Sequence, residues 1–237
     1  MFKLFRYELR RLLWNKFFPA LTLITIWYAR QILTGEILMG ISNTAPFSGW
    51  SFGVFLAQVS PLLLITLLFF LTFLYSEQEK EVRKLTDPVL LSPIKYHFVQ
   101  YGAIAAGYLI LCIIVLVEAG ICYYKWFGFR EFQTLILPAL LVLVPSFLFL
   151  FGLGNILGRI KGSLLYALML LMLVLTQLPM PVWFDLLGES YLREYPLSLG
   201  IVEPAFQLSL TAGISRLIFC LTGILFTALA LRKKKEQ

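Results

Sequence analysis

The sequence predicts an all-α, polytopic membrane protein with six transmembrane helices, an N-terminal interfacial amphipathic helix and both termini in the cytoplasm. Of the 237 residues, 59% are hydrophobic and 14% are charged, whereas soluble domains average about 45–50% apolar and about 25% charged residues. The apolar residues fall in runs of about 20, the length that crosses a hydrocarbon core of about 30 Å. Basic residues gather in alternate connections between these runs. Because water cannot solvate so much continuous apolar surface, a soluble protein is excluded.

Residues 1–16 predict an elbow helix that lies in the membrane interface. One helical face carries apolar side chains and another carries basic ones: Phe2, Phe5, Leu9, Leu12 and Leu13 against Lys3, Arg6 and Arg10. A helix of this kind turns its basic face toward anionic headgroups. The plain alternative is a positive-inside tail of the first span.

The rest of the single transmembrane domain, 17–231, divides into six apolar runs. They lie at about 17–35, 51–75, 98–123, 132–157, 163–183 and 210–231. The second, fourth and fifth runs contain no charged residue, whereas the first and sixth each contain an arginine. The first and sixth spans are therefore the least strongly predicted.

The distribution of basic residues predicts the orientation. A cytoplasmic N-terminus places most of the 20 lysines and arginines on the inner side, including those of the basic tail 232–237. The basic residues left for the outer half are Arg30, Lys125, Arg130, Arg193 and Arg216. The positive-inside rule therefore favours N-in, C-in in the cell (cytoplasmic) membrane. Topology also accounts for the net charge of +7, so no nucleic-acid partner is expected.

Two connections are long enough to carry structure of their own, 76–97 on the inner side and 184–209 on the outer side. The outer connection is apolar and aromatic, and we expect it to form short helices resting on the outer leaflet. Aromatic residues there and near the span ends predict an interfacial belt. They are Trp27, Tyr28, Trp50, Tyr123, Tyr124, Trp126, Trp183 and Tyr191.

The first part of the inner connection, 76–85, favours a helix that continues the second span, since Glu79 precedes Arg83 by four residues. Pro88 then breaks the helix, and Pro93 suits the first turn of a new one. The tip between the two prolines is apolar, which favours docking into a groove on a partner. A solvated charged loop is the alternative.

Three charges fall in the outer third of their spans. Arg30, Glu118 and Arg216 lie roughly 20–30 Å from the inner face at 1.5 Å per residue. An unpaired charge at that depth costs a few kcal/mol, so we expect Glu118 to pair with Arg30 or Arg216. Snorkelling to the interface and contact with a substrate are the alternatives.

Two pairs of small residues at four-residue spacing, Ala103/Gly107 and Gly154/Gly158, predict close approach of neighbouring helices. The stretch GLGNILGRIKGS at 152–163 looks like a phosphate-binding loop but has Arg159 directly after Gly158, so it predicts a tight turn. No zinc-protease, serine-hydrolase or paired-aspartate motif is present. We therefore expect no enzyme, no metal site and no cofactor bound by this chain.

Together these features resemble the type-2 ABC exporter permease family. The stretch FKLFRYELRRLLWNKFF looks like the elbow helix of that family. The stretch at 76–109 looks like its segment of acidic residues, a Leu-rich stretch and a Pro-led helix, although Glu81-Val82-Arg83 stands where a glycine-threonine often follows the acidic pair. The proline-bearing outer connection is similar to the short outer helices that precede the last span of the family.

The resemblance implies two six-span subunits, identical or similar, that enclose a path and rest on separate ABC ATPase subunits. ATP and Mg would bind the ATPase, and the substrate would be an amphipathic or hydrophobic peptide, lipid or drug. By position, the residues that couple to the ATPase would be Glu77, Glu79, Arg83 and Leu85, with Pro88 and Pro93 shaping the segment.

Two other classes stay open. A non-ABC transporter or channel needs intramembrane carboxylates or broken helices near the midplane, and the uncharged second, fourth and fifth spans count against it. A membrane scaffold or immunity protein would bind partners without dependence on ATP.

Overall fold

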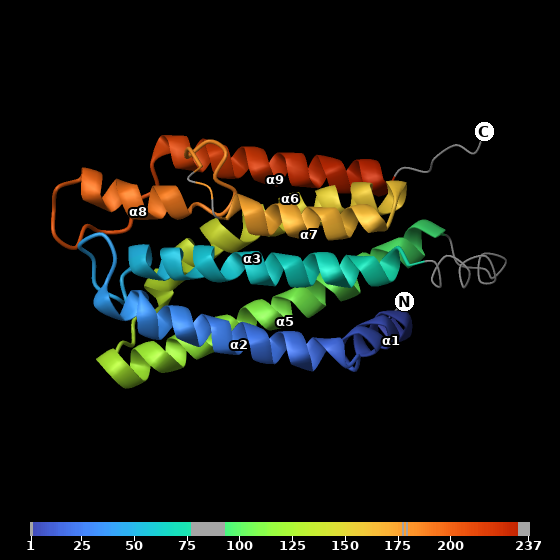
Figure 1. The fold of residues 1–237 in the computed structure, drawn as a ribbon, viewed down its shortest axis with the longest axis horizontal. Helices are drawn as coiled ribbons and strands as arrows, with labels where there is room; N and C mark the ends of the chain where they lie inside the picture. The colour runs from blue at the N-terminus through green and yellow to red at the C-terminus, as the bar shows by residue number, and fades with distance from the viewer. Residues whose placement is uncertain (1, 77–92, 177, 179, 232–237) are drawn as a thin grey trace.

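The computed structural model describes residues 2–76, 93–176, 178 and 180–231, and these ranges are all-helical. The helices are α1 (Phe2–Leu13), α2 (Phe17–Gly35), α3 (Gly49–Leu74), α5 (Pro93–Phe127), α6 (Ile136–Ile160), α7 (Ser163–Leu175), α8 (Glu189–Ser198) and α9 (Leu210–Leu231), with 3₁₀ turns η1 (Ile37–Met39) and η2 (Phe132–Leu135). Figure 1 shows the long helices running along one elongated bundle. The predicted all-α class is confirmed.

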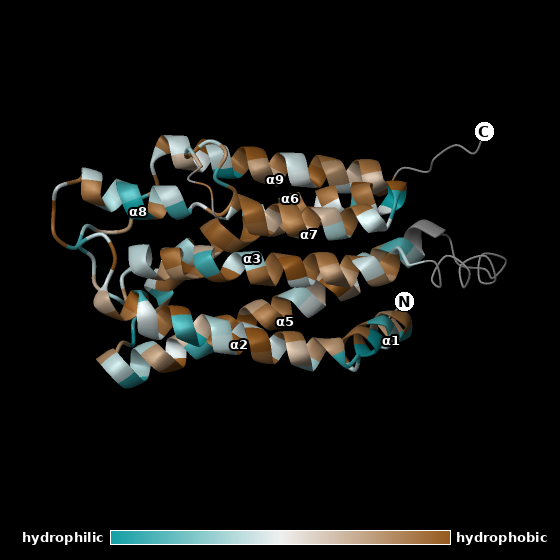
Figure 2. Ribbon diagram, in the orientation of Figure 1, coloured by the Kyte–Doolittle hydropathy of each residue, from teal (hydrophilic) through white to brown (hydrophobic). Residues whose placement is uncertain are grey.

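Four helical segments of the described chain are long and apolar enough to cross a membrane: Gly49–Leu74, Tyr96–Phe127, Phe132–Ile160 and Leu210–Leu231. In Figure 2 the hydrophobic colour runs along the middle of these helices. The two other predicted spans correspond to weaker helices. α2 has 19 residues but contains Arg30, and α7 has 13 residues, which is about 20 Å at 1.5 Å per residue.

Consecutive long helices alternate in direction, so the bundle has two distinct ends (Figure 1). One end, here called the elbow end, holds α1, the end of α3, the start of α5, the α6–α7 turn and the end of α9. The other, here called the α8 end, holds α8 and the α2–α3 connection. The first and last described helices therefore reach the same end.

Helix α3 forms the centre of the bundle. Its residues are apolar all round, and most of them are buried, as expected for a helix surrounded by others. It packs against α2, α5, α6, α7 and α8. Helices α6 and α9 approach each other closely, since a Cβ added at Gly152 would lie 2.3 Å from the carbonyl oxygen of Gly223.

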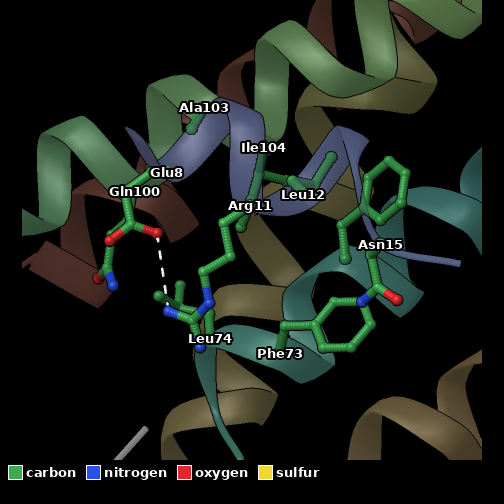
Figure 3. Close-up of a pocket in the computed structure, with 10 residues that line it drawn as sticks. Glu8, Arg11, Leu12, Asn15, Phe73, Leu74, Gln100, Ala103 and Ile104 are labelled. Carbon is green, nitrogen blue, oxygen red and sulfur yellow. Dashed lines mark ion pairs between the residues drawn. The ribbon is translucent and has the colours of Figure 1, made fainter. Parts of the chain in front are cut away.

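The elbow helix α1 packs on the start of α5. A Cβ added at Gly107 would lie 2.7 Å from Cδ2 of Leu12, so one of the predicted small residues receives the apolar face of α1. The hydroxyl of Tyr96 donates to Oε1 of Glu8 at 3.2 Å, and Glu8 pairs with Arg11 at 3.9 Å. Figure 3 shows Glu8, Arg11 and Leu12 of α1 beside a cavity of about 60 Å³ between α1, α3 and α5.

The connection 76–97, predicted to lie on the inner side, is only partly described. Helix α5 begins at Pro93, as predicted. Helix α3 ends at Leu74, because Tyr75 leaves the helical region with φ −106° and ψ 13° and Ser76 is a bend. Helix α3 therefore ends before the segment 76–85 that was predicted to continue it, and residues 77–85 lie outside the described residues. The residues predicted to couple to an ATPase, Glu77, Glu79, Arg83, Leu85 and Pro88, and the tail 232–237 lie outside the described residues.

The connection 184–209, predicted to lie on the outer side as short helices on the leaflet, contains the helix α8, which packs on the start of α3. The buried ring of Trp50 lies 5.9 Å from the ring of Tyr191 and 5.6 Å from that of Tyr195. Its Nε1 donates to the carbonyl of Pro204 at 2.9 Å. Trp50, Tyr123 and Tyr191 are therefore core residues rather than members of the predicted belt, whereas Trp27, Tyr124, Trp126 and Trp183 are exposed.

Candidate functional site

A groove opens between α2, α3 and α7 in the half of the bundle that the sequence predicts to face outward, and it is here called the outer groove. Its volume is about 590 Å³. Apolar side chains, among them Trp27, Leu62 and Leu173, form much of its wall, and Glu36 and Gln58 stand beside them. A concave site of this size with apolar walls and a few polar groups is typical of a binding site for a small molecule or a segment of a larger one.

The sequence forms the groove by helical spacing. On α2, Tyr28 and Ile32 are four residues apart and face the groove, because residues at i and i+4 share one helical face. On α3, Ala57 and Pro61 do the same. Pro61 has no N–H to donate to the carbonyl of Ala57, so the wall also loses one helical hydrogen bond there.

Four polar side chains, here called the outer tie, join α2, α3 and α8 at one end of the groove. Nη2 of Arg193 lies 2.6 Å from Oε1 of Glu36 and 2.8 Å from Oε1 of Glu189. Nε2 of Gln58 donates to Oε2 of Glu36 at 2.5 Å and to Oε1 of Glu189 at 3.5 Å. One guanidinium thus lies between two carboxylates at the rim of an apolar cavity.

The outer tie sets the charge of its members. Burial raises the pKa of Glu36, but hydrogen bonds from Gln58 and Arg193 and the charge of Arg193 outweigh it, so the pKa falls below its ordinary 4.5. Burial lowers the pKa of Arg193, but hydrogen bonds to Glu36 and Glu189 and their charges raise it overall. At neutral pH the Glu36–Arg193 contact is therefore an ion pair.

A second cavity of about 460 Å³ lies beneath α8 and shares Thr176 and Glu189 with the outer groove. Its polar wall includes Asp185, whose carboxylate accepts hydrogen bonds from the backbone N–H groups of Gly188 and Ser190, both at 2.7 Å. These bonds satisfy N–H groups at the start of α8, so Asp185 fixes the position of the helix that carries half of the outer tie.

Arg216 lies on α9 at this same end and is buried. Its Nη1 donates to the carbonyl of Leu186, and Asp185 is the acidic residue whose charge acts on it. Gly188 has φ +82°, and a Cβ there would lie 2.3 Å from Nη2 of Arg216. Arg216 thus fixes the backbone around Leu186 and Gly188, directly before α8 begins.

The three charges singled out in the sequence are not one cluster. Arg30 lies on α2 and acts electrostatically on Glu118 of α5, whereas Arg216 is placed with Asp185. Oε2 of Glu118 is buried and accepts no hydrogen bond from the described residues. Of the two expected partners of Glu118, the structure favours Arg30, and none of the three charges lines the outer groove.

Reasoning from the sequence alone did not predict the outer tie. Two signals were present: Gln58 is polar within an uncharged apolar run, and Glu189 and Arg193 have the i, i+4 spacing of a helical ion pair. Neither signal reveals that the end of α2 meets α8, because that contact joins segments far apart in the chain.

No other chemical centre is evident in the part of the chain that the structure describes. Within it, no group of three or more His, Cys, Asp or Glu side chains could hold a metal ion. The phosphate-loop look-alike is the end of α6 and a tight turn before α7 begins at Ser163, as predicted. No family model matches the chain, and no curated protein or solved structure matches it either.

Proposed function

We propose that the chain is the membrane-spanning permease subunit of an ABC exporter, which moves an amphipathic or hydrophobic substrate (a peptide, lipid or drug). The outer groove is the observation that carries the proposal. It combines an apolar wall that includes Trp27 and Leu173 with the carboxylates of Glu36 and Glu189 at its rim. Such a surface suits a molecule with an apolar body and a polar group.

In this proposal the protein crosses the cell membrane six times, with α2 and α7 as the first and fifth spans. The elbow end is cytoplasmic, because α1 carries Lys3, Arg6 and Arg10 there, and Arg159 and Lys161 stand at the end of α6. The α8 end, with the outer tie, then faces outward. Both termini are cytoplasmic, and lipid covers the exposed apolar surfaces.

A separate ABC ATPase subunit binds at the elbow end and supplies ATP and Mg, which this chain does not bind in the proposal. The segment with Glu77, Glu79, Arg83, Leu85 and Pro88 couples to the ATPase, and Pro93 begins the helix that leaves it. The position of this segment between α3 and α5 supports the assignment, since a force on it acts on two helices of the bundle.

A second permease subunit, identical or similar, closes the open side of the outer groove. The α2 and α7 surfaces beside the groove are apolar and exposed, with Ile24 at 51% and Leu173 at 50%. Two such surfaces that face one another would enclose a path between apolar walls, with polar groups near one end. No nucleic acid takes part.

The proposal is tested by purifying the tagged chain in mild detergent, identifying copurified proteins by mass spectrometry and measuring ATPase activity. We expect an ATPase with Walker motifs to copurify. Leu85→Asp should release it, whereas Lys233→Glu, a charge change in the C-terminal tail, should not. A chain that purifies alone, or an ATPase that stays bound to Leu85→Asp and to a variant with residues 79–93 replaced, contradicts the proposal.

The same purified chain separates the other classes. Flux through liposomes that contain the chain without any ATPase would favour a non-ABC transporter or channel. A stable partner whose binding does not respond to ATP would favour a scaffold or immunity protein.

A further inference from the structure

A buried polar cluster, here called the inner triad, lies at the elbow end. It consists of Tyr75 at the end of α3, Tyr101 of α5 and Asn155 of α6. Their exposed fractions are 7%, 5% and 0%. Polar side chains that are buried to this extent need hydrogen-bond partners, because a buried polar group without one costs free energy.

The three side chains bond to one another through the hydroxyl of Tyr75. This hydroxyl donates to Oδ1 of Asn155 at 2.9 Å and lies 3.2 Å from the hydroxyl of Tyr101. Nδ2 of Asn155 donates to the carbonyl of Phe151 one turn earlier in α6 at 2.7 Å, which fixes the orientation of the amide. A single oxygen atom, on the residue that follows α3, therefore links α5 and α6.

Tyr75 is also tightly enclosed by glycines of α6 and the α6–α7 turn. A Cβ added at Gly158 would lie 2.3 Å from Cδ2 of Tyr75, and one added at Gly162 would lie 3.0 Å from its carbonyl oxygen. Close-packed surfaces transmit a displacement rather than absorb it. A shift of Tyr75 must therefore move the α6–α7 turn or break the contact.

The position of Tyr75 in the chain gives this contact its significance. Tyr75 is two residues before the segment 77–92, and α5, which carries Tyr101, begins directly after that segment. On the far side, α7 begins at Ser163 and reaches the outer groove with Leu173 and Thr176. The described chain thus holds a continuous packed route from both ends of the segment to the groove.

We propose that the inner triad positions α7 in response to the ATPase subunit. When the ATPase displaces the segment 77–92, the Tyr75–Tyr101 and Tyr75–Asn155 hydrogen bonds change, and this change moves α7 at the outer groove. The inference rests on the proposed function, since it requires an ATPase that acts on that segment. The structure holds the triad in its bonded arrangement. In the inference an ATPase that favours a separated arrangement shifts this equilibrium and thereby biases the groove.

The test uses the complex of the full chain with its copurified ATPase. Hydrogen–deuterium exchange is measured at the amides of the α6–α7 turn, without nucleotide and with ATP plus vanadate. Tyr75→Phe keeps the ring against Gly158 and removes the hydroxyl. The matched control is Tyr123→Phe, which removes another buried hydroxyl that bonds to no group of the described chain.

We expect the wild-type turn to change its exchange when nucleotide binds, and Tyr123→Phe to change equally. In Tyr75→Phe the response should fall about fivefold or more, as for loss of a coupling of ordinary size, while the ATPase still copurifies. If Tyr75→Phe does not accumulate, Tyr101→Phe takes its place. This variant keeps the hydrogen bond from Tyr75 to Asn155, so the exchange response to nucleotide should be lost only in part.

A full response in Tyr75→Phe, or in Tyr101→Phe where that variant takes its place, overturns the inference but leaves the proposed function intact. An equal loss in Tyr123→Phe overturns it too, because any buried hydroxyl would then have the same effect. A wild-type chain without an ATPase refutes the proposed function and the inference with it.

Discussion

Arg193 of α8 lies 2.6 Å from Glu36 at the end of α2, so an ion pair closes the end of the outer groove between segments that are far apart in the chain. The two side chains are 33% and 45% exposed, which places the pair at the surface of the bundle. An ion pair of this exposure contributes modestly, about 0.5–1 kcal/mol. It is the ion pair of the outer tie that joins α8 to the end of α2, since Arg193 and Glu189 both lie on α8 and Gln58 is neutral.

Replacing Arg193 with Ala should lower the melting temperature by about 1–3 °C, the shift expected for a loss of up to about 1 kcal/mol in a chain of this size. The reason is that Glu36 and Glu189 then face each other without a guanidinium between them. Thermal unfolding in detergent measures the shift. Arg130→Ala is the control, since Arg130 is exposed and its Cζ lies over the ring of Tyr124, 6.0 Å from the ring centroid, rather than between two carboxylates. Equal shifts in both variants would refute a specific tie.

The same pair predicts a dependence on pH. The pKa of Glu36 in the folded chain lies below its ordinary 4.5, so the unfolded chain takes up this proton at a higher pH than the folded chain does. The contribution of the pair is therefore complete above about pH 4.5 and is lost as the pH falls through the lowered pKa. The melting-temperature difference between wild type and Arg193→Ala should be constant from pH 7 to 5 and shrink below 4.5. In a Glu36→Gln background the shrinkage should be smaller, and a difference that grows toward acid would contradict the assignment.

The sequence predicted features that depend on neighbouring residues. The amphipathic pattern of α1, the start of α5 at Pro93 and the tight turn after Ile160 are all local, and the structure has each of them. The small residues Gly107 and Gly158 were also expected at close helix contacts, and they lie against Leu12 and Tyr75. Local periodicity and backbone chemistry suffice for such features.

Features that depend on distant contacts were not predictable. Trp50 looked like an interfacial residue because it lies at the end of a span, yet α8 covers it. The end of α3 at Leu74 also follows from tertiary structure, since Tyr75 leaves the helix and bonds to α5 and α6. The outer tie has the same origin. A single sequence does not reveal which helices are neighbours.

The contact of α6 with α9 predicts a sharp difference between two glycines of one helix. A Cβ added at Gly223 would lie 2.4 Å from the carbonyl carbon and oxygen of Leu148, which are backbone atoms that cannot rotate away, whereas one added at Gly213 meets Leu208 at an ordinary 3.5 Å. Gly223→Ala should therefore destabilise the protein by about 1–3 kcal/mol, and Gly213→Ala should be tolerated. Thermal unfolding of both variants decides, and an equal effect would mean that α9 does not approach α6 so closely.

The pairing of Glu118 with Arg30 is best tested by a double-mutant cycle of Glu118→Gln and Arg30→Gln. The two residues lie on adjacent helices, and the charge of Arg30 acts on Glu118, so their effects on unfolding should deviate from additivity by about 0.5–1 kcal/mol. The cycle of Glu118→Gln with Arg216→Lys is the control and should be additive, because Arg216 is held by Leu186 and Asp185. Additive effects in the first cycle would mean that Arg30 extends to the membrane interface and does not pair with Glu118. Non-additive effects in the second cycle would mean that Glu118 pairs with Arg216, the other partner expected from the sequence.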